Sequence, residues 1–81
     1  MFLLERKNKY LVELGKRIKQ VRKTKELSQE QLALKAEIDR SYMGGIERGE
    51  RNVTFLTLVK LATCLGCDVA EFTKGIPNDK R

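Results

Sequence analysis

Apolar residues recur along the chain at steps of three and four, the spacing that places them on one face of an α-helix. The first such stretch runs from Tyr10 to about Lys25, and its apolar face consists of Leu11, Leu14, Ile18 and Val21. The basic residues between them fall largely on the opposite face. The pattern predicts an amphipathic first helix that gives one side to a core.

Two shorter helices are predicted between residues 28 and 48. Ser28 and Gln31 have the spacing of a capping box, which marks the start of the first one. The facing apolar sides are Leu32, Ala33 and Ala36 in the first helix and Ile38, Met43 and Ile46 in the second. Small Ala33 allows a close crossing of the two helices. The polar residues and glycines are expected to point outward: Arg40, Ser41, Gly44, Gly45 and Arg48. Two short helices joined by a tight turn form a helix-turn-helix, the layout of a DNA reader.

Two further helices are predicted in the C-terminal third. Thr54 is a suitable cap for a fourth helix, which ends at Gly66 and has the apolar positions Leu58, Leu61, Ala62 and Leu65. Asp68 and Glu71 repeat the capping-box spacing and predict a short fifth helix through about Lys74. No stretch favours a strand, so the predicted fold class is all-α with five helices.

The length of 81 residues limits the chain to one domain with a small core. We expect a domain over residues 10–75, an N-terminal extension over 1–9 and a tail over 76–81, with both ends candidates for disorder. No window reaches the roughly 20 apolar residues of a membrane span, and the N-terminus does not have the pattern of a secretory signal. A cytoplasmic protein with no membrane partner is expected.

The net charge of +6 is concentrated at one end of the chain. Residues 1–27 contain nine Lys or Arg against three Glu, whereas the other residues contain eight of each sign. Such a field attracts a polyanion such as DNA. A solvated helix face that keeps a small protein soluble would show the same charge.

Few residues could support catalysis or bind a metal. The chain has no His. Its two cysteines, Cys64 and Cys67, have no second pair of Cys or His residues with which to complete a zinc site. We therefore expect no enzyme activity, cofactor, metal or small-molecule ligand. The C-x-x-C spacing admits a redox switch, but small apolar residues in a reducing compartment are the favoured interpretation.

Four linked segments between about Leu11 and Phe72 carry a family resemblance: LGKRIKQVR, LSQEQLALKAEI, DRSYMGGIERGERN and LVKLATCLGCDVAEF. In order and spacing they resemble the lambda-repressor-like DNA-binding domain of the Cro/cI or XRE family of transcriptional regulators. The third segment also resembles the controller proteins of restriction-modification systems, which act as dimers. The resemblance implies a compact five-helix fold.

In this family the second helix of the motif lies in the major groove of double-stranded DNA. The resemblance then implies that Arg40, Ser41 and Tyr42 read base edges, with Arg40 suited to guanine. Tyr42 could equally be a half-buried helix residue. Expected contacts to the DNA backbone come from Gln29, Gly44, Gly45, Arg48, Arg51 and Asn52. The two arginines could instead pair with Glu47 or Glu50.

The family also implies a partly buried ion pair between Arg22 and Glu47, with a structural role. The chain departs from the family pattern at two places. Gly45 stands where relatives often place a longer base-reading side chain, and Glu37 stands in the turn where the motif favours Gly. Bare backbone at Gly44 would let the helix approach the DNA closely.

A single reading helix rarely gives both affinity and specificity, so we expect a homodimer on an inverted-repeat operator. Its interface candidates are Val69, Phe72 and Ile76, with Phe2, Leu3 and Leu4 as a second possibility; the alternative for all of them is the monomer core. The expected function is an autoregulatory transcriptional regulator, a repressor or a controller-type activator in contact with RNA polymerase. The alternative is an antitoxin that binds a toxin partner and regulates its own operon.

Overall fold

Each of the first four helices begins at a residue whose side chain caps the backbone. In the computed structural model, which describes residues 7–77, the helices are α1 (Lys9–Thr24), α2 (Gln29–Ala36), α3 (Arg40–Glu47), α4 (Phe55–Leu65) and α5 (Ala70–Thr73). Over this range the chain contains no strand. The prediction of an all-α chain with five helices is confirmed.

Two of these four caps were predicted correctly and two were not identified. Ser28 accepts the N–H of Gln31 and forms the complete capping box, and Thr54 accepts the N–H of Thr57. The caps that were not identified are Asp39 at the start of α3 and Asn8, whose side chain accepts backbone N–H groups at the start of α1. The first helix therefore begins at Lys9, one residue before the predicted start at Tyr10.

The start of α5 also differs from the prediction. Val69 occupies the capping position and makes no side-chain hydrogen bond, while the Asp68 carboxylate accepts the N–H of Ala70 at 3.0 Å. The helix therefore begins two residues after Asp68, rather than directly after it in a box with Glu71. The predicted end near Lys74 agrees with the structure, where Lys74 is the C-cap.

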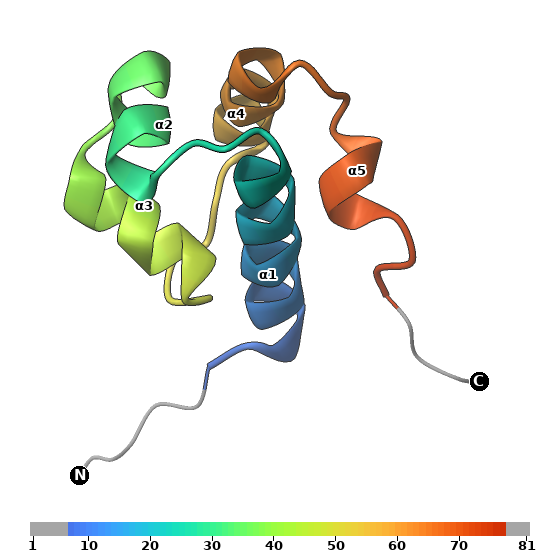
Figure 1. Cartoon of the computed structure of the whole chain (residues 1–81). Helices are drawn as coiled ribbons and strands as arrows, with labels where there is room; N and C mark the ends of the chain where they lie inside the picture. The colour runs from blue at the N-terminus through green and yellow to red at the C-terminus, as the bar shows by residue number, and fades with distance from the viewer. Residues whose placement is uncertain (1–6, 78–81) are drawn as a thin grey trace, which may run out of the picture.

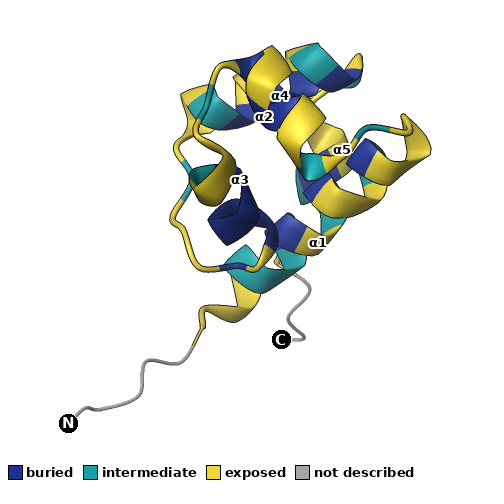
Figure 2. Ribbon diagram, turned by 60° about the vertical axis from the view of Figure 1, so that its left-hand side comes forward, coloured by how far each residue is buried: buried dark blue, intermediate teal, exposed yellow. Residues whose placement is uncertain are grey.

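The long helix α1 organises the domain. It contacts α3 on one side and α5 on the other, while α2 contacts both α3 and α4 (Figure 1). Every helix contributes one side chain with no exposed surface to the core: Ile18, Leu32, Met43, Leu61 and Phe72 are each 0% exposed. The buried segments of the ribbons face one another in Figure 2. This shared core fixes α2 and α3 relative to α1.

The crossing of α1 and α3 depends on a glycine, Gly15, to which sequence reasoning assigned no role. A Cβ atom added to Gly15 would lie 2.4 Å from the carbonyl oxygen of Ile46, so only glycine allows α1 and α3 to approach this closely. Ala33, which was predicted at a close crossing, is 2% exposed. Gly15 therefore sets how deeply α3 sits against the domain.

The predicted interface candidates have different environments. Phe72 is fully buried in the core, so it has no surface for a partner and its assignment to an interface is corrected to the core. Val69 and Ile76 are half-buried and pack against the same cluster. Phe2, Leu3 and Leu4 lie outside the described residues.

Within residues 7–77 no helix is long and apolar enough to cross a membrane.

Candidate DNA-reading surface

The turn between α2 and α3 has the backbone geometry of the motif despite its unusual residue. Glu37 adopts a left-handed conformation, with φ 58° and ψ 43°. The N–H of Ile38 then donates to the carbonyl of Ala33 at 2.9 Å, which closes the end of α2. Glu37 thus performs the role that glycine has in related turns.

Asp39 caps α3 and holds its first turn in place. Its carboxylate accepts the backbone N–H groups of Ser41 at 3.0 Å and Tyr42 at 3.2 Å, together with the hydroxyl of Ser41. These hydrogen bonds hold the pKa of Asp39 below its ordinary value. The bond from the Ser41 hydroxyl has the largest effect, and the two backbone N–H groups add to it. Asp39 therefore stays ionised at neutral pH, and the Ser41 hydroxyl is oriented by it.

Arg40, one of the predicted base-reading residues, is exposed. Its side chain is 69% exposed at the start of α3. The carboxylate of Glu30 on α2 lies 3.8 Å from a guanidinium nitrogen of Arg40, and Glu30 is itself 72% exposed. An exposed ion pair at this distance contributes little, so the guanidinium is available to a ligand.

Tyr42 is half-buried, packs against the core and contacts a loop arginine. The Arg51 Cζ atom lies 5.4 Å from the centre of the Tyr42 ring, a cation–π arrangement. The half-burial of Tyr42 agrees with its interpretation as a partly buried helix residue, whereas its reading of base edges stays a prediction. The ring also contacts a cation that is itself exposed.

Gly44 and Gly45 do not point freely outward as predicted, because both are buried. A Cβ atom at Gly44 would lie 2.9 Å from a guanidinium nitrogen of Arg48 and 3.3 Å from the side-chain oxygen of Gln29. A Cβ atom at Gly45 would lie 3.0 Å from Cγ of Arg51. The prediction overlooked that the long side chains of Gln29, Arg48 and Arg51 cover this part of α3. The ribbon there is coloured as buried in Figure 2.

Arg22 and Glu47 form the buried ion pair that the family resemblance implied. Arg22 Nε donates to one carboxylate oxygen of Glu47 at 2.6 Å, and Nη2 donates to the other at 3.0 Å. Nη1 donates to the carbonyl of Leu27 at 2.7 Å. Gln29 Nε2 donates to the same carboxylate at 3.0 Å. The predicted phosphate clamp Gln29 thus uses its amide nitrogen within the protein.

The loop after α3 turns back over that helix. Gly49 has φ +79°, and a Cβ atom there would lie 2.6 Å from Cα of Val12 on α1. The N–H of Glu50 donates to the carbonyl of Gly45 at 2.8 Å. The predicted rival contact of Arg48 is present as well, since its Nε lies 3.2 Å from the Glu50 carboxylate. Asn52 is exposed farther along the same loop.

Sequence reasoning assigned Gly49 no role beyond ending the helical pattern. The available signal was its place directly after a helix, where glycine commonly takes a left-handed conformation. The close approach to Val12 had no sequence signal, because it depends on how α1 and α3 pack.

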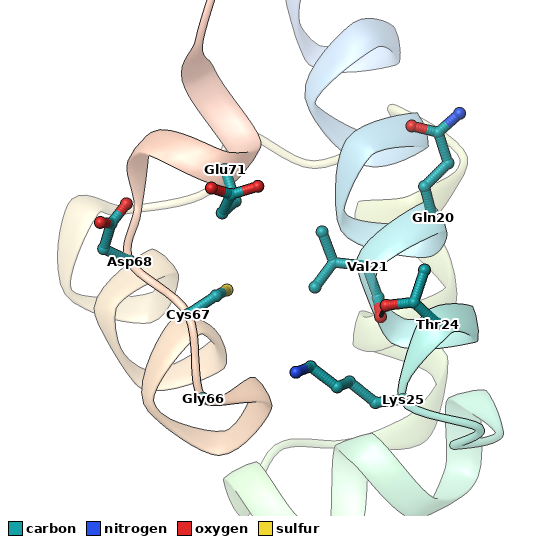
Figure 3. Close-up of a pocket in the computed structure, with 8 residues that line it drawn as sticks. All are labelled: Gln20, Val21, Thr24, Lys25, Gly66, Cys67, Asp68 and Glu71. Atoms are coloured by element: carbon teal, nitrogen blue, oxygen red, sulfur yellow. Dashed lines mark hydrogen bonds between the residues drawn. The ribbon is translucent and has the colours of Figure 1, made fainter.

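A separate pocket of about 470 Å³ lies between α1 and the α4–α5 connection (Figure 3). Its lining contains no residue of α2 or α3 and consists of Gln20, Val21, Thr24, Lys25, Gly66, Cys67, Asp68 and Glu71. Burial, and then the nearby Glu71 and Asp68 carboxylates, raise the pKa of the Cys67 thiol. A protonated thiol is a poor nucleophile, which disfavours a redox role. Cys64 and Cys67 are both free and half-buried.

Comparison with known proteins agrees with this geometry. Residues 18–72 match the family HTH_3, described as helix-turn-helix. The control protein C.MunI from Mycoplasma sp. is 36% identical over 73 residues, which cover 89% of this chain and 99% of that protein. The solved restriction-modification controller protein C.AhdI from Aeromonas hydrophila has a TM-score of 0.78 and 46% identity, covering 80% of this chain and 98% of its own.

A second similar structure was determined with DNA present. SinR, described as the master regulator for biofilm formation, was solved in complex with DNA and has a TM-score of 0.67 and 40% identity. The match covers 69% of this chain and 90% of the SinR chain. With its helix-turn-helix, its five-helix fold and its similarity to controller proteins, the chain belongs to the HTH_3 family, whose domain is of the Cro/cI (XRE) type.

Proposed function

We propose that the protein is a sequence-specific DNA-binding transcriptional regulator that reads the major groove with the first turn of α3. The observation that carries this proposal is the exposed Arg40 guanidinium, held at the start of a helix that is otherwise packed into the core. A rigid helix that presents an exposed guanidinium fits the bidentate recognition of guanine. Ser41 and Tyr42 stand beside it on the same turn.

Contacts to the DNA backbone would surround this reading turn. Arg48, Arg51 and Asn52 follow α3 on the loop, and Gln29 opens α2 where free N–H groups favour a phosphate. Gly44 and Gly45 would contact the DNA backbone only after the side chains that cover them move toward the DNA. These side chains belong to Gln29, Arg48 and Arg51. In this arrangement the protein acts without catalysis, cofactor or metal.

We further propose a homodimer that binds an inverted-repeat operator and controls its own gene or a neighbouring one. One chain offers one reading helix, and two helices must lie about 34 Å apart to meet successive major grooves. Val69 and Ile76 remain the proposed interface, since both are only half-buried. A bacterial regulator of this kind works in the cytoplasm and can also contact RNA polymerase. The relatives are named as control proteins and a regulator, which does not favour the antitoxin alternative.

Selection from a randomised duplex library at about 150 mM salt tests this function, because that ionic strength suppresses purely electrostatic binding. We expect retained sequences to share an inverted repeat with half-sites about one helical turn apart. Recovery of unrelated sequences, or of none, would contradict the proposal.

Sedimentation of the selected complex then tests the dimer and its surface. We expect two chains per duplex, and Val69→Asp should reduce the complex to one chain. Leu56→Asp is the matched control, because Leu56 on α4 is also apolar and is 77% exposed. Loss of the dimer in Leu56→Asp alone would move the interface to α4, and thermal unfolding of both variants checks their folding.

A further inference from the structure

The side chain that α3 lacks at position 45 is replaced by one from the following loop. A Cβ atom built at Gly45 would lie 3.0 Å from Cγ, 3.3 Å from Nε and 3.7 Å from Cδ of Arg51. The aliphatic part of Arg51 therefore lies in the space that a side chain of residue 45 would take. A Cβ atom at this position would therefore push the Arg51 side chain aside by a few tenths of an ångström.

The backbone of the loop places Arg51 there. Gly49 turns the chain in a left-handed conformation directly against Val12, where no other residue fits without a shift. The N–H of Glu50 then bonds to the carbonyl of Gly45 at 2.8 Å. Because this bond joins the loop to α3 at Gly45 itself, the next residue, Arg51, starts beside that glycine.

The ring of Tyr42 fixes the other end of the arginine. Tyr42 and Gly45 are three residues apart and so lie on the same face of α3. The Arg51 Cζ atom lies 5.4 Å from the ring centre, while packing of Tyr42 against the core holds the ring in place. Arg51 itself remains exposed. A guanidinium over an aromatic ring can still donate its N–H groups to a ligand.

We propose that Tyr42 and Gly45 are positioning residues for Arg51, which acts as a second DNA-contacting side chain of the reading helix although it belongs to the loop. This inference rests on the proposed function and deepens it. Tyr42 then acts through its ring, by holding the arginine, rather than through its hydroxyl on a base. Holding Arg51 in place before binding lowers the entropy lost on binding, which amounts to roughly a three- to tenfold gain in affinity.

NMR of the DNA-free protein tests the positioning alone. The ring current of Tyr42 should shift the Arg51 side-chain protons upfield in the natural protein. Tyr42→Leu should abolish this shift, Gly45→Ala should reduce it because its Cβ pushes the Arg51 side chain aside, and Tyr42→Phe should keep it because the ring is retained. Unshifted Arg51 protons in the natural protein would overturn the proposed geometry, whether or not the protein binds DNA.

A double-mutant cycle on the selected operator tests the consequence for binding. Tyr42→Leu should weaken binding roughly three- to tenfold when Arg51 is present, and should cause no further loss in the Arg51→Ala background. Arg48→Ala is the matched control background, because Arg48 has the same charge but lies over Gly44; here Tyr42→Leu should keep its full effect. Tyr42→Phe should recover most of the lost affinity.

Two results would overturn the inference while leaving the proposed function intact. One is an equal loss from Tyr42→Leu with and without Arg51, which would make Tyr42 a direct DNA contact. The other is a Tyr42→Phe variant as weak as Tyr42→Leu, which would assign the role to the hydroxyl. Failure of the natural protein to prefer any sequence would instead contradict the proposed function. Comparing the variants below their unfolding temperatures excludes loss of folding as the cause.

Discussion

At the scale of single residues, Glu37 carries a backbone cost inside the helix-turn-helix. A non-glycine residue in the left-handed region, here at φ 58°, is less stable than glycine by about 1–2 kcal/mol. The turn nevertheless forms, because the α2–α3 core and the Asp39 cap determine where the chain must go. The sequence correctly indicated the unusual residue, and the structure shows that the turn geometry is kept.

We predict that Glu37→Gly stabilises the domain by about 0.5–1 kcal/mol, since relief of the backbone cost exceeds the added entropy of the unfolded chain. The midpoint temperature of thermal unfolding should rise by about 2–8 °C for a domain of this size. Glu37→Ala is the control, because alanine retains the cost of the left-handed conformation. A Glu37→Gly protein that unfolds at a lower temperature than the natural one would contradict this account.

Other residue-scale features could not be found from the sequence. Gly15 and Gly49 are required because backbone from another helix lies within 3 Å of their missing Cβ atoms. Such a contact depends on which helices meet and at what depth, which one amphipathic pattern does not specify. The burial of Gly44 and Gly45 was missed for the same reason, since the covering side chains come from α2 and the loop.

At the scale of helices, one buried carboxylate connects three elements. Glu47 at the end of α3 bonds to Arg22 of α1 and to Gln29 of α2. The described part of the chain leaves no buried side-chain nitrogen or oxygen without a partner. The network therefore fixes the two helices of the motif against α1, and its loss would resemble the loss of a DNA contact.

We predict that Arg22→Met lowers the free energy of unfolding by about 3–5 kcal/mol, because it leaves the Glu47 carboxylate buried with only Gln29 as partner. The double variant Arg22→Met, Glu47→Met should recover much of this loss, since it removes both charges. Denaturant unfolding measures both effects. An operator affinity that falls in the fully folded Arg22→Met protein at low temperature would instead indicate a direct contact with DNA.

The positions of the helices could be read from periodicity and caps because both are local. The spacing of apolar residues gave all four buried positions of α4, and Gly66 ends that helix with φ +69° as expected. The start of α5 was less predictable. The Asp68 side chain accepts the N–H of Ala70, the first residue of α5. The spacing of Asp68 and Glu71 alone therefore placed the start of this helix too early.

At the scale of the whole molecule, charge and shape have separate roles in the proposed binding. The net charge of +6 comes from residues 1–27, and Lys16, Lys19 and Lys23 are exposed on α1. Such charges attract any DNA in a salt-dependent way, whereas the first turn of α3 discriminates between sequences. The sequence indicated both parts, but it could not show that α3 exposes mainly its first turn.

In the proposed function, Arg40 gives the protein its preference for one DNA sequence. The most direct test measures the affinity for the selected operator relative to a scrambled duplex, at about 150 mM salt, for the natural protein, Arg40→Ala and Arg40→Lys. Arg40→Lys keeps the charge but not the bidentate geometry. Both variants should lose about 1–3 kcal/mol of discrimination per half-site, while Arg40→Lys should still bind the scrambled duplex like the natural protein. An unchanged preference for the operator in both variants would contradict the assignment of base reading to Arg40.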